Sequence, residues 1–331
     1  MSSLRNPRVW IGVAVSAASI ALLFYQVKIQ EVGSALTRVN YAWLVLGIAV
    51  EMVSLWIRGA RWRVILEETV KVSNSYAFSV LIIGYAANNL LPLRAGELVR
   101  AHLVYVQHGT SRLSTLGTIL VERIFDVLVL ALMVAGPVVL LGSSVAYRNT
   151  AFLVLAAAGF ATVVLALFAL WSGFSRFVLS TTSLLPTGVR PKVRALLESF
   201  MDGVVALRRP GPWLAVSAFS LASWAIESVA YWLVGIGFGL DLNPLVYVML
   251  CGVATLVLAA PTTAGGLGVF ELSVQAVATS FGVPIATATA YAIGIHVLVL
   301  LLPVIVLGLA LLWRQNLGIS SMVQAQSAGT E

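Results

Sequence analysis

The apolar sequence is interrupted by the stretch Asn88-Asn89-Leu90-Leu91-Pro92-Leu93-Arg94-Ala95-Gly96-Glu97-Leu98-Val99-Arg100. Two amides, a proline, a glycine and three charges fall within these 13 residues, although only 10% of the protein's residues are charged. In lipid, an unsatisfied backbone group or charge is costly unless protein or water supplies a partner. We therefore expect this stretch to line a cavity or a binding site. The alternative is a cytoplasmic loop between two spans.

The composition excludes a soluble globular protein. Of the 331 residues, 60% are hydrophobic, whereas about half is usual in soluble domains. Apolar runs of about 17 to 29 residues recur along the chain, and each is long enough to cross a bilayer as a helix. The alternating short strands of a membrane β-barrel do not occur. The sequence thus predicts an all-α polytopic membrane protein.

The distribution of basic residues predicts the topology. The net charge is +7, yet residues 210–313 contain no lysine or arginine. Basic residues favour the cytoplasmic side, which gives six full spans with both termini cytoplasmic, in the plasma membrane of a prokaryote. The spans are expected at 9–27, 41–57, 113–141, 151–171, 213–239 and 287–313, and two re-entrant helical hairpins at 76–107 and 244–281. Residues 1–315 would form one transmembrane domain and 316–331 a flexible cytoplasmic tail.

An internal repeat accompanies this topology. The pattern P-x-x-A-G-x-L begins at Pro92 and again at Pro261, which is 169 residues later. Trp43-Leu44 recurs as Trp213-Leu214, and the sequence V-L-V-L at 127–130 recurs at 297–300, both at an offset of 170. The repeat units are about 41–141 and 213–313, and the charge pattern makes them inverted. Inverted repeats with broken helices that meet near the midplane are typical of secondary transporters.

Three ordered motifs also resemble a known family. These are N-x-x-P-x-x-x-G-E-x-x-R from Asn89 to Arg100, E-R-x-x-D from Glu122 to Asp126, and P-x-x-x-G-G-L-G-x-x-E from Pro261 to Glu271. Together they resemble the transmembrane region of lysylphosphatidylglycerol synthases, also called the flippase-like domain family, over about residues 10–315. The family usually has a proline where this chain has Ala264. The resemblance implies lipid translocation by a stand-alone member without the aminoacyl-transfer domain.

The candidate substrate-binding residues lie at the two breaks. Arg94 and Arg100 are expected to bind a lipid phosphate, with Glu97 holding the Arg100 guanidinium until the phosphate arrives. Ordinary positive-inside charge is the alternative. The remaining candidates at the breaks are Asn88, Asn89, Gly96, Gly265, Gly266 and Glu271. The glycines also have a simpler explanation, because they permit a tight turn.

Buried charges within the spans are candidates for coupling to protons. Glu122, Arg123 and Asp126 lie about 15 Å into the membrane, where they would relay a proton, contact a headgroup or form a structural ion pair. Glu51 and Glu227 lie deep in other spans and are further proton-site candidates. A protonated glutamate bonded to the neighbouring backbone is the alternative for both.

We therefore predict translocation of an anionic phospholipid or a polyprenyl phosphate between leaflets, coupled to an ion gradient, and no enzymatic activity. One alternative is a membrane-embedded transferase acting on a lipid phosphate, for which Glu97, Glu122 and Asp126 have no known catalytic spacing. Another is a membrane anchor for a glycosyltransferase or lipid-modifying enzyme. The histidines and the single Cys251 lack metal-ligand spacing. We expect no metal, cofactor or nucleic acid, and the oligomeric state remains open.

Overall fold

The computed structural model describes residues 7–25, 27–91, 95–142, 145–204, 210–258 and 264–315. Every regular element in these ranges is a helix, so the prediction of an all-α polytopic membrane protein is confirmed. The first half contains α1 (Pro7–Tyr25), α2 (Ile29–Thr37), α3 (Tyr41–Leu66), α4 (Asn74–Leu90), α5 (Gly96–His108) and α6 (Arg112–Leu140). The second half contains α7 (Val145–Leu170), α8 (Ser172–Thr181), a short η3 (Thr182–Leu184), α9 (Arg190–Val204), α10 (Pro210–Gly237), α11 (Pro244–Val257), η5 (Ala264–Gly266), α12 (Val269–Ser280), α13 (Ile285–Ile293), the π-helical η6 (Gly294–Leu301) and α14 (Leu302–Arg314).

Four described helices are long and apolar enough to cross a membrane, namely Tyr41–Leu66, Arg112–Leu140, Gly211–Gly237 and Ile285–Arg314. Two further pairs qualify only if each bent pair is one span. These pairs are Val13–Tyr25 with Ile29–Thr37, bent by 82°, and Leu155–Phe168 with Gly173–Leu184, bent by 102°. The six predicted full spans are therefore the upper limit among the described residues.

Local sequence explains where several helices begin. The Asn40 side chain accepts a hydrogen bond from the Ala42 amide at the start of α3. Ser73 and Asn243 do the same for α4 and α11, with Tyr76 and Leu245 as the donors. Such N-caps satisfy amides that would otherwise lack partners. Helices α4 and α11 therefore begin in the same way in the two halves.

Helices α4 and α11 are too short to cross a bilayer. Helix α4 has 17 residues and α11 has 14, which at 1.5 Å per residue gives about 26 and 21 Å against a hydrocarbon core of about 30 Å. Each is followed by a break and a second helix, α5 or α12. The turn predicted at Pro92 to Gly96 includes residues 92–94, which lie outside the described residues, as do 259–263 in the second break and the predicted tail at 316–331.

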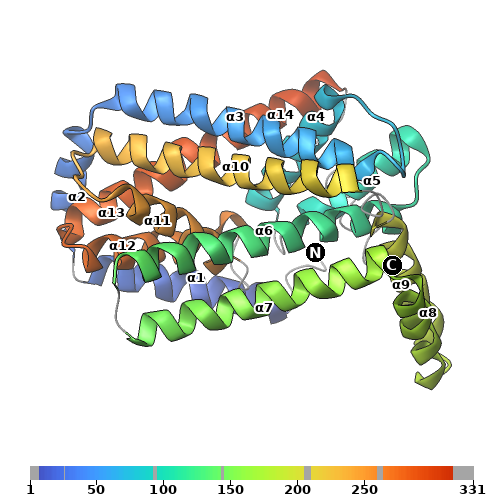
Figure 1. Cartoon of the computed structure of the whole chain (residues 1–331). Helices are drawn as coiled ribbons and strands as arrows, with labels where there is room; N and C mark the ends of the chain where they lie inside the picture. The colour runs from blue at the N-terminus through green and yellow to red at the C-terminus, as the bar shows by residue number, and fades with distance from the viewer. Residues whose placement is uncertain are drawn as a thin grey trace.

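The two halves pack against each other, and the first helix of each hairpin packs on a helix of the other half. Helices α3 and α10 run antiparallel and side by side through the bundle (Figure 1), with the Asn40 amide bonded to the Gly237 carbonyl at one end. Helix α4 packs on α14 of the second half, and α11 packs on α6 of the first. The α4–α5 hairpin enters from one end of the bundle and α11–α12 from the other (Figure 1). Their inner ends therefore lie near the middle.

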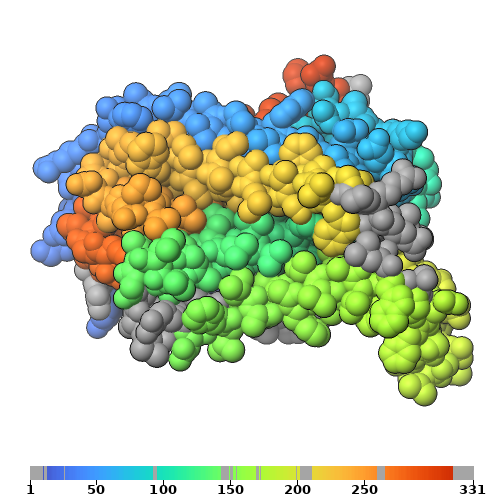
Figure 2. Space-filling view, in the orientation of Figure 1, coloured from blue at the N-terminus to red at the C-terminus, as the bar shows by residue number. Residues whose placement is uncertain are grey.

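The outer elements of the second half do not cover this centre. Helix α7 lies along α6 at the edge of the molecule, while α8 and α9 project from one corner (Figures 1 and 2). Helix α9 carries Arg190, Lys192 and Arg194, and its side chains are mostly exposed or half-buried.

Candidate functional site

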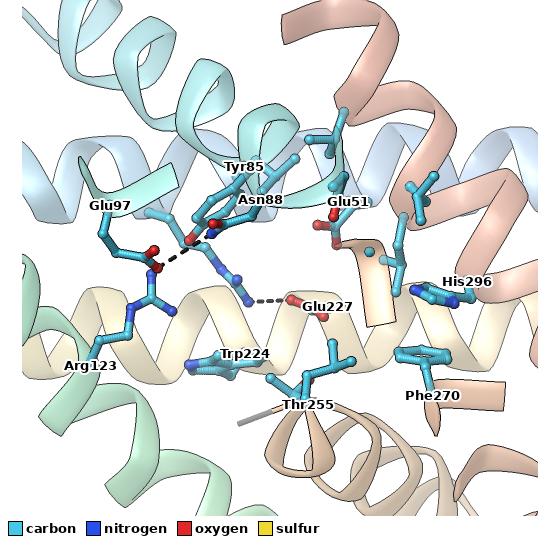
Figure 3. A pocket seen from close by; sticks show the side chains of 18 residues that line it. Glu51, Tyr85, Asn88, Glu97, Arg123, Trp224, Glu227, Thr255, Phe270 and His296 are labelled. Carbon is cyan, nitrogen blue, oxygen red and sulfur yellow. Dashed lines mark hydrogen bonds and ion pairs between the residues drawn. The ribbon is translucent and has the colours of Figure 1, made fainter. Parts of the chain in front are cut away.

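A polar cavity of about 170 Å³ lies where the inner ends of the two hairpins meet (Figure 3). Its walls come from α3, α4, α5, α6, α10, η6, α14 and both sides of the second break. The residues that line it are Glu51, Leu55, Arg58, Tyr85, Asn88, Asn89, Glu97, Arg123, Trp224, Glu227, Thr255, Leu258, Gly265, Phe270, His296, Leu300, Leu301 and Val304. Five charged side chains thus face one cavity inside an apolar bundle.

The tip of the first hairpin is held by Asn88. Its Oδ1 accepts a hydrogen bond from the Gly96 amide at 2.7 Å, and its Nδ2 donates to Glu97 Oε1 at 3.4 Å. The helices approach so closely that a Cβ added to Gly96 would lie 2.0 Å from the Gly84 carbonyl oxygen. Asn88 therefore satisfies the first amide of α5, while Gly96 allows the close contact.

The tip of the second hairpin turns on three glycines with left-handed backbone, Gly265, Gly266 and Gly268, whose φ values are 70°, 68° and 86°. The simpler explanation of these glycines, a tight turn, thus agrees with the backbone. A Cβ added to Gly265 would lie 3.7 Å from the Asn89 carbonyl oxygen, so the two tips are neighbours.

Glu271 stabilises the second tip. Its Oε2 accepts from the Gly268 amide at 2.7 Å, and its Oε1 lies 2.7 Å from Nδ1 of His296. The His296 ring stacks on Phe270 with centroids 4.0 Å apart. Glu271 therefore joins the start of α12 to the π-helical segment of the last span, and His296 presents its ring to the cavity.

A buried ion network lies behind the first hairpin. Glu122 accepts hydrogen bonds from Arg100 Nη2 at 2.9 Å and from Arg123 Nη2 at 2.8 Å. Asp126 accepts one from Arg61 Nη1 at 2.6 Å. The side chains of Arg61 and Glu122 are 0% exposed, whereas that of Arg123 is 39% exposed. Buried ions are tolerated in proteins when each has a charged, hydrogen-bonded partner. This network therefore ties α3, α5 and α6 together, and Arg123 is the member that reaches the cavity.

Two tryptophans extend the network. Trp224 Nε1 donates to Asp126 Oδ1 at 2.9 Å, and its ring carries the Arg58 guanidinium at 3.9 Å. Arg58 also forms a salt bridge with Glu227. The Arg100 guanidinium lies 4.0 Å over Trp62. These aromatic faces supply a second favourable environment for guanidinium groups that lie away from water.

Glu51 differs from the other buried carboxylates. It is 3% exposed and faces the cavity (Figure 3), and its Oε2 has no hydrogen-bond partner among the described residues. A buried carboxylate oxygen without a partner is costly. Glu51 is therefore the carboxylate in the cavity wall with the greatest capacity to take a proton or a ligand donor.

The structure brings many of the predicted site residues together. Seven of them line the cavity, namely Glu51, Asn88, Asn89, Glu97, Arg123, Glu227 and Gly265. Gly96, Arg100, Glu122, Asp126 and Glu271 lie behind its wall and make the contacts described above, while Gly266 lies in the second turn. Arg94 lies outside the described residues.

One predicted contact is wrong. Arg100 was expected to pair with Glu97, three residues earlier on the same helix, but within the described residues it pairs with Glu122 of α6. At 1% exposure it lies within the protein, where a bidentate carboxylate and the Trp62 face stabilise the charge better than a neighbour on the same helix. This arrangement leaves Arg123, and not Arg100, in the cavity wall.

Sequence reasoning missed six polar or aromatic residues of the cavity, Arg58, Tyr85, Trp224, Thr255, Phe270 and His296. Arg58 looked like an ordinary cytoplasmic arginine at the end of a span. His296 could have been found from the repeat, because Asp126 and His296 each directly precede the sequence V-L-V-L at the 170-residue offset. Tyr85 and Trp224 carried no signal that distinguishes them from other aromatic residues in spans.

Comparisons with known proteins agree with the membrane architecture. The family model described as "Lysylphosphatidylglycerol synthase TM region" matches residues 9–308. The chain is 25% identical over 305 residues to "Glycosyltransferase AglD" of Haloferax volcanii, covering 81% of this chain and 48% of that protein. It is 24% identical over 283 residues to a "UPF0104 membrane protein" of Methanothermobacter thermautotrophicus, covering 79% and 82% respectively. The chain thus spans about half the length of the glycosyltransferase.

Proposed function

We propose, from the premise that this chain belongs to the lysylphosphatidylglycerol synthase transmembrane-region family, that it moves a lipid between the two leaflets of a membrane. The substrate is an anionic lipid of the phospholipid or polyprenyl-phosphate type. The membrane is the plasma membrane of a prokaryote, with both termini of the domain on the cytoplasmic side.

The observation that carries this proposal is the polar cavity between the inner ends of two hairpins that enter from opposite ends of the bundle. A lipid headgroup that crosses a bilayer needs a polar path, because the hydrocarbon offers it no hydrogen bonds. Broken helices that meet near the midplane supply such a site in secondary transporters. Opening at either hairpin would expose the same cavity to one leaflet or to the other.

Arg123 and Arg58 are the headgroup ligands that the cavity favours. Arg123 lines it with a partly exposed side chain, and a guanidinium binds phosphate oxygens through two parallel hydrogen bonds. Arg58 lines it too, but it is 8% exposed and pairs with Glu227, whereas Arg123 is 39% exposed and pairs with Glu122. Phosphate binding would therefore begin at Arg123 and draw Arg58 away from its carboxylate.

Coupling to a proton gradient is assigned to the wall carboxylates. Glu122 and Asp126 are each held by at least two arginine contacts, and each keeps an arginine partner when Arg123 turns to a phosphate. Glu51, with its unpartnered oxygen, and Glu227, which would lose Arg58 to a phosphate, are free of that restraint. A proton that enters at Glu51 or Glu227 would then accompany the headgroup.

Reconstitution of the purified protein in liposomes tests the proposal. Fluorescent phosphatidylglycerol in one leaflet should become accessible to a membrane-impermeant quencher faster than in protein-free liposomes. Arg123→Ala should abolish the difference, and Arg194→Ala should leave it unchanged. Arg194 is a suitable control because it pairs with Glu198 on the exposed face of α9. Equal rates with and without wild-type protein would reject lipid translocation.

A second candidate function follows from the similarity to a protein named as a glycosyltransferase. This chain would then anchor or supply lipid to such an enzyme. Transport by the purified chain alone would favour translocation, whereas transport that appears only with an added glycosyltransferase would favour the anchor. An enzymatic role is not part of our proposal, because Glu97, Glu122 and Asp126 have no known catalytic spacing.

A further inference from the structure

An apolar groove of about 370 Å³ runs along the surface between α6, α10 and α11. It is lined by Val129, Leu132, Met133, Leu221, Trp224, Ala225, Ser228, Val229, Trp232, Pro244 and Val248. Helices α6 and α10 lie beside each other on the face shown in Figure 2. Leu132, Leu221 and Trp232 in its wall are 46%, 53% and 43% exposed, so the groove opens to the surroundings of the bundle, which are lipid.

Trp224 separates this groove from the polar cavity. It is 2% exposed and lines both spaces. Within the protein, its ring carries the Arg58 guanidinium and its indole nitrogen donates to Asp126. The Trp224 side chain thus forms part of the wall of both the polar cavity and the apolar groove.

Most of the groove lies toward one end of the bundle. From Trp224 near the middle of α10 it continues through Val229 and Trp232 to Pro244, the first residue of α11. Most of a chain lying in it would therefore occupy a single leaflet, the one at the end where α10 finishes and α11 begins.

The corresponding place in the first half is filled. Ser54 and Ser223 contact each other where α3 crosses α10. Trp56 follows Ser54 by two residues and Ala225 follows Ser223 by two, so Trp56 and Ala225 occupy equivalent positions in the two halves. Phe78 and Val248 each follow the first residue of α4 and α11 by four positions. Trp56 and Phe78 pack against each other with ring centroids 5.1 Å apart and ring planes at 53°, whereas Ala225 and Val248 leave the groove between them.

We propose that this groove holds a hydrocarbon tail of the transported lipid while its headgroup occupies the polar cavity, with Trp224 between the two. The inference rests on the proposed lipid translocation and specifies where the apolar part of the substrate binds. A tail lying along these side chains gains van der Waals contacts with them, since it moves from hydrocarbon into an apolar groove and not out of water. The same tail also keeps the lipid attached to its leaflet while the headgroup enters.

The test is the variant Ala225→Trp. It introduces in the second half the tryptophan that Trp56 supplies at the equivalent position of the first half. Ala225 is exposed, so the added ring enters the groove without displacing the core. Ala218→Trp is the matched control, because Ala218 is an exposed alanine two turns earlier on the same face of α10 and is not part of the groove. Both variants are reconstituted with two labelled phosphatidylglycerols, one with oleoyl chains and one with hexanoyl chains.

Ala225→Trp should slow transport of the oleoyl lipid by roughly tenfold relative to Ala218→Trp and leave the hexanoyl lipid within about twofold, because only the long chain reaches the groove. Val248→Phe should have the same selective effect. Equal slowing of both lipids would place the defect in the headgroup cavity and overturn the inference, as would oleoyl transport equal to that of the control. Wild-type protein that moves neither lipid would overturn the proposed function itself.

Discussion

The Ser54 hydroxyl donates a hydrogen bond to the Ser223 carbonyl at 3.0 Å, and these serines are separated by 169 residues, the offset that also relates Pro92 to Pro261. On one side of this pair the Asn40 amide donates to the Gly237 carbonyl, and on the other side Arg61 donates to the Ser220 hydroxyl. Residue numbers therefore rise along α3 as they fall along α10. Where two inverted copies cross on a two-fold axis, the residue on the axis meets its own counterpart. The position of this pair is the one expected for such an axis.

Arg100 and Arg123 should respond differently to removal. Arg100→Ala leaves Glu122 buried with a partner lost, and breaking a buried ion pair typically costs about 3–5 kcal/mol, so we expect a large fall in folded protein. Arg123→Ala also removes a partner of Glu122, but Arg123 is 39% exposed and Glu122 keeps Arg100 and Arg61, so we expect a smaller loss of folded protein together with loss of transport. Thermal unfolding in detergent and liposome flux measure the two effects. A stable, inactive Arg100→Ala would instead support direct substrate binding by Arg100.

Glu51→Gln should separate downhill exchange from accumulation. The amide resembles a permanently protonated carboxyl, so the variant should still equilibrate lipid but no longer concentrate it in response to a pH gradient. The measurement is lipid flux with and without an imposed gradient, with Glu198→Gln on the exposed α9 as the control. Wild-type flux that ignores the gradient would reject proton coupling and favour passive scrambling.

Asp126→Asn is expected to act on stability. Asp126 accepts Arg61 through both oxygens, at 2.6 and 3.2 Å, and Trp224 at 2.9 Å. In the variant, the fully buried Arg61 loses the negative charge of Asp126 and keeps only that of Glu122. The variant should therefore unfold at a lower temperature and give less folded protein. A variant as stable as wild type that loses only gradient-driven accumulation would return Asp126 to the coupling pathway.

Gly96→Ala should disrupt the first hairpin. The added Cβ would meet the Gly84 carbonyl oxygen at 2.0 Å and Asn88 Oδ1 at 2.7 Å, so backbone must move. Overpacking of this kind typically costs about 1–3 kcal/mol, and we expect a lower unfolding temperature together with lost transport. Gly159→Ala in α7 is the control, since nothing lies within 4 Å of its added Cβ and alanine favours a helix. Comparable destabilisation of both variants would argue against the close helix contact.

Cysteine labelling tests the topology. Ser111 and Asp241 are exposed and lie at the start of α6 and after the end of α10. A cysteine at Ser111 should react only from the cytoplasmic side and one at Asp241 only from outside. The native Cys251 is buried, so it should not contribute to labelling of the folded protein. Reaction of the Ser111 cysteine from outside alone would exclude the inverted arrangement.

The all-helical membrane architecture was predictable because it depends on local composition, whereas the inverted repeat stays a prediction. A run of about 20 apolar residues suffices to predict a membrane helix. A cluster such as Asn88 to Arg100 marks an interruption whatever surrounds it. The 169- and 170-residue offsets between Pro92 and Pro261 and between the two V-L-V-L sequences are likewise properties of the chain itself.

The partners of the charged residues were decided only by tertiary packing. Spacing on one helix suggested that Arg100 meets Glu97, but the approach of α5 to α6 offers Glu122, which is 22 residues away. Arg58 reaches the cavity because α3 packs against α10 and its Glu227, 169 residues later. Sequence periodicity specifies which face of a helix a charge occupies, whereas its counter-charge depends on which helix packs there. For this reason the polar character of the site could be predicted from sequence, while the division between structural ion pairs and cavity-lining groups required the fold.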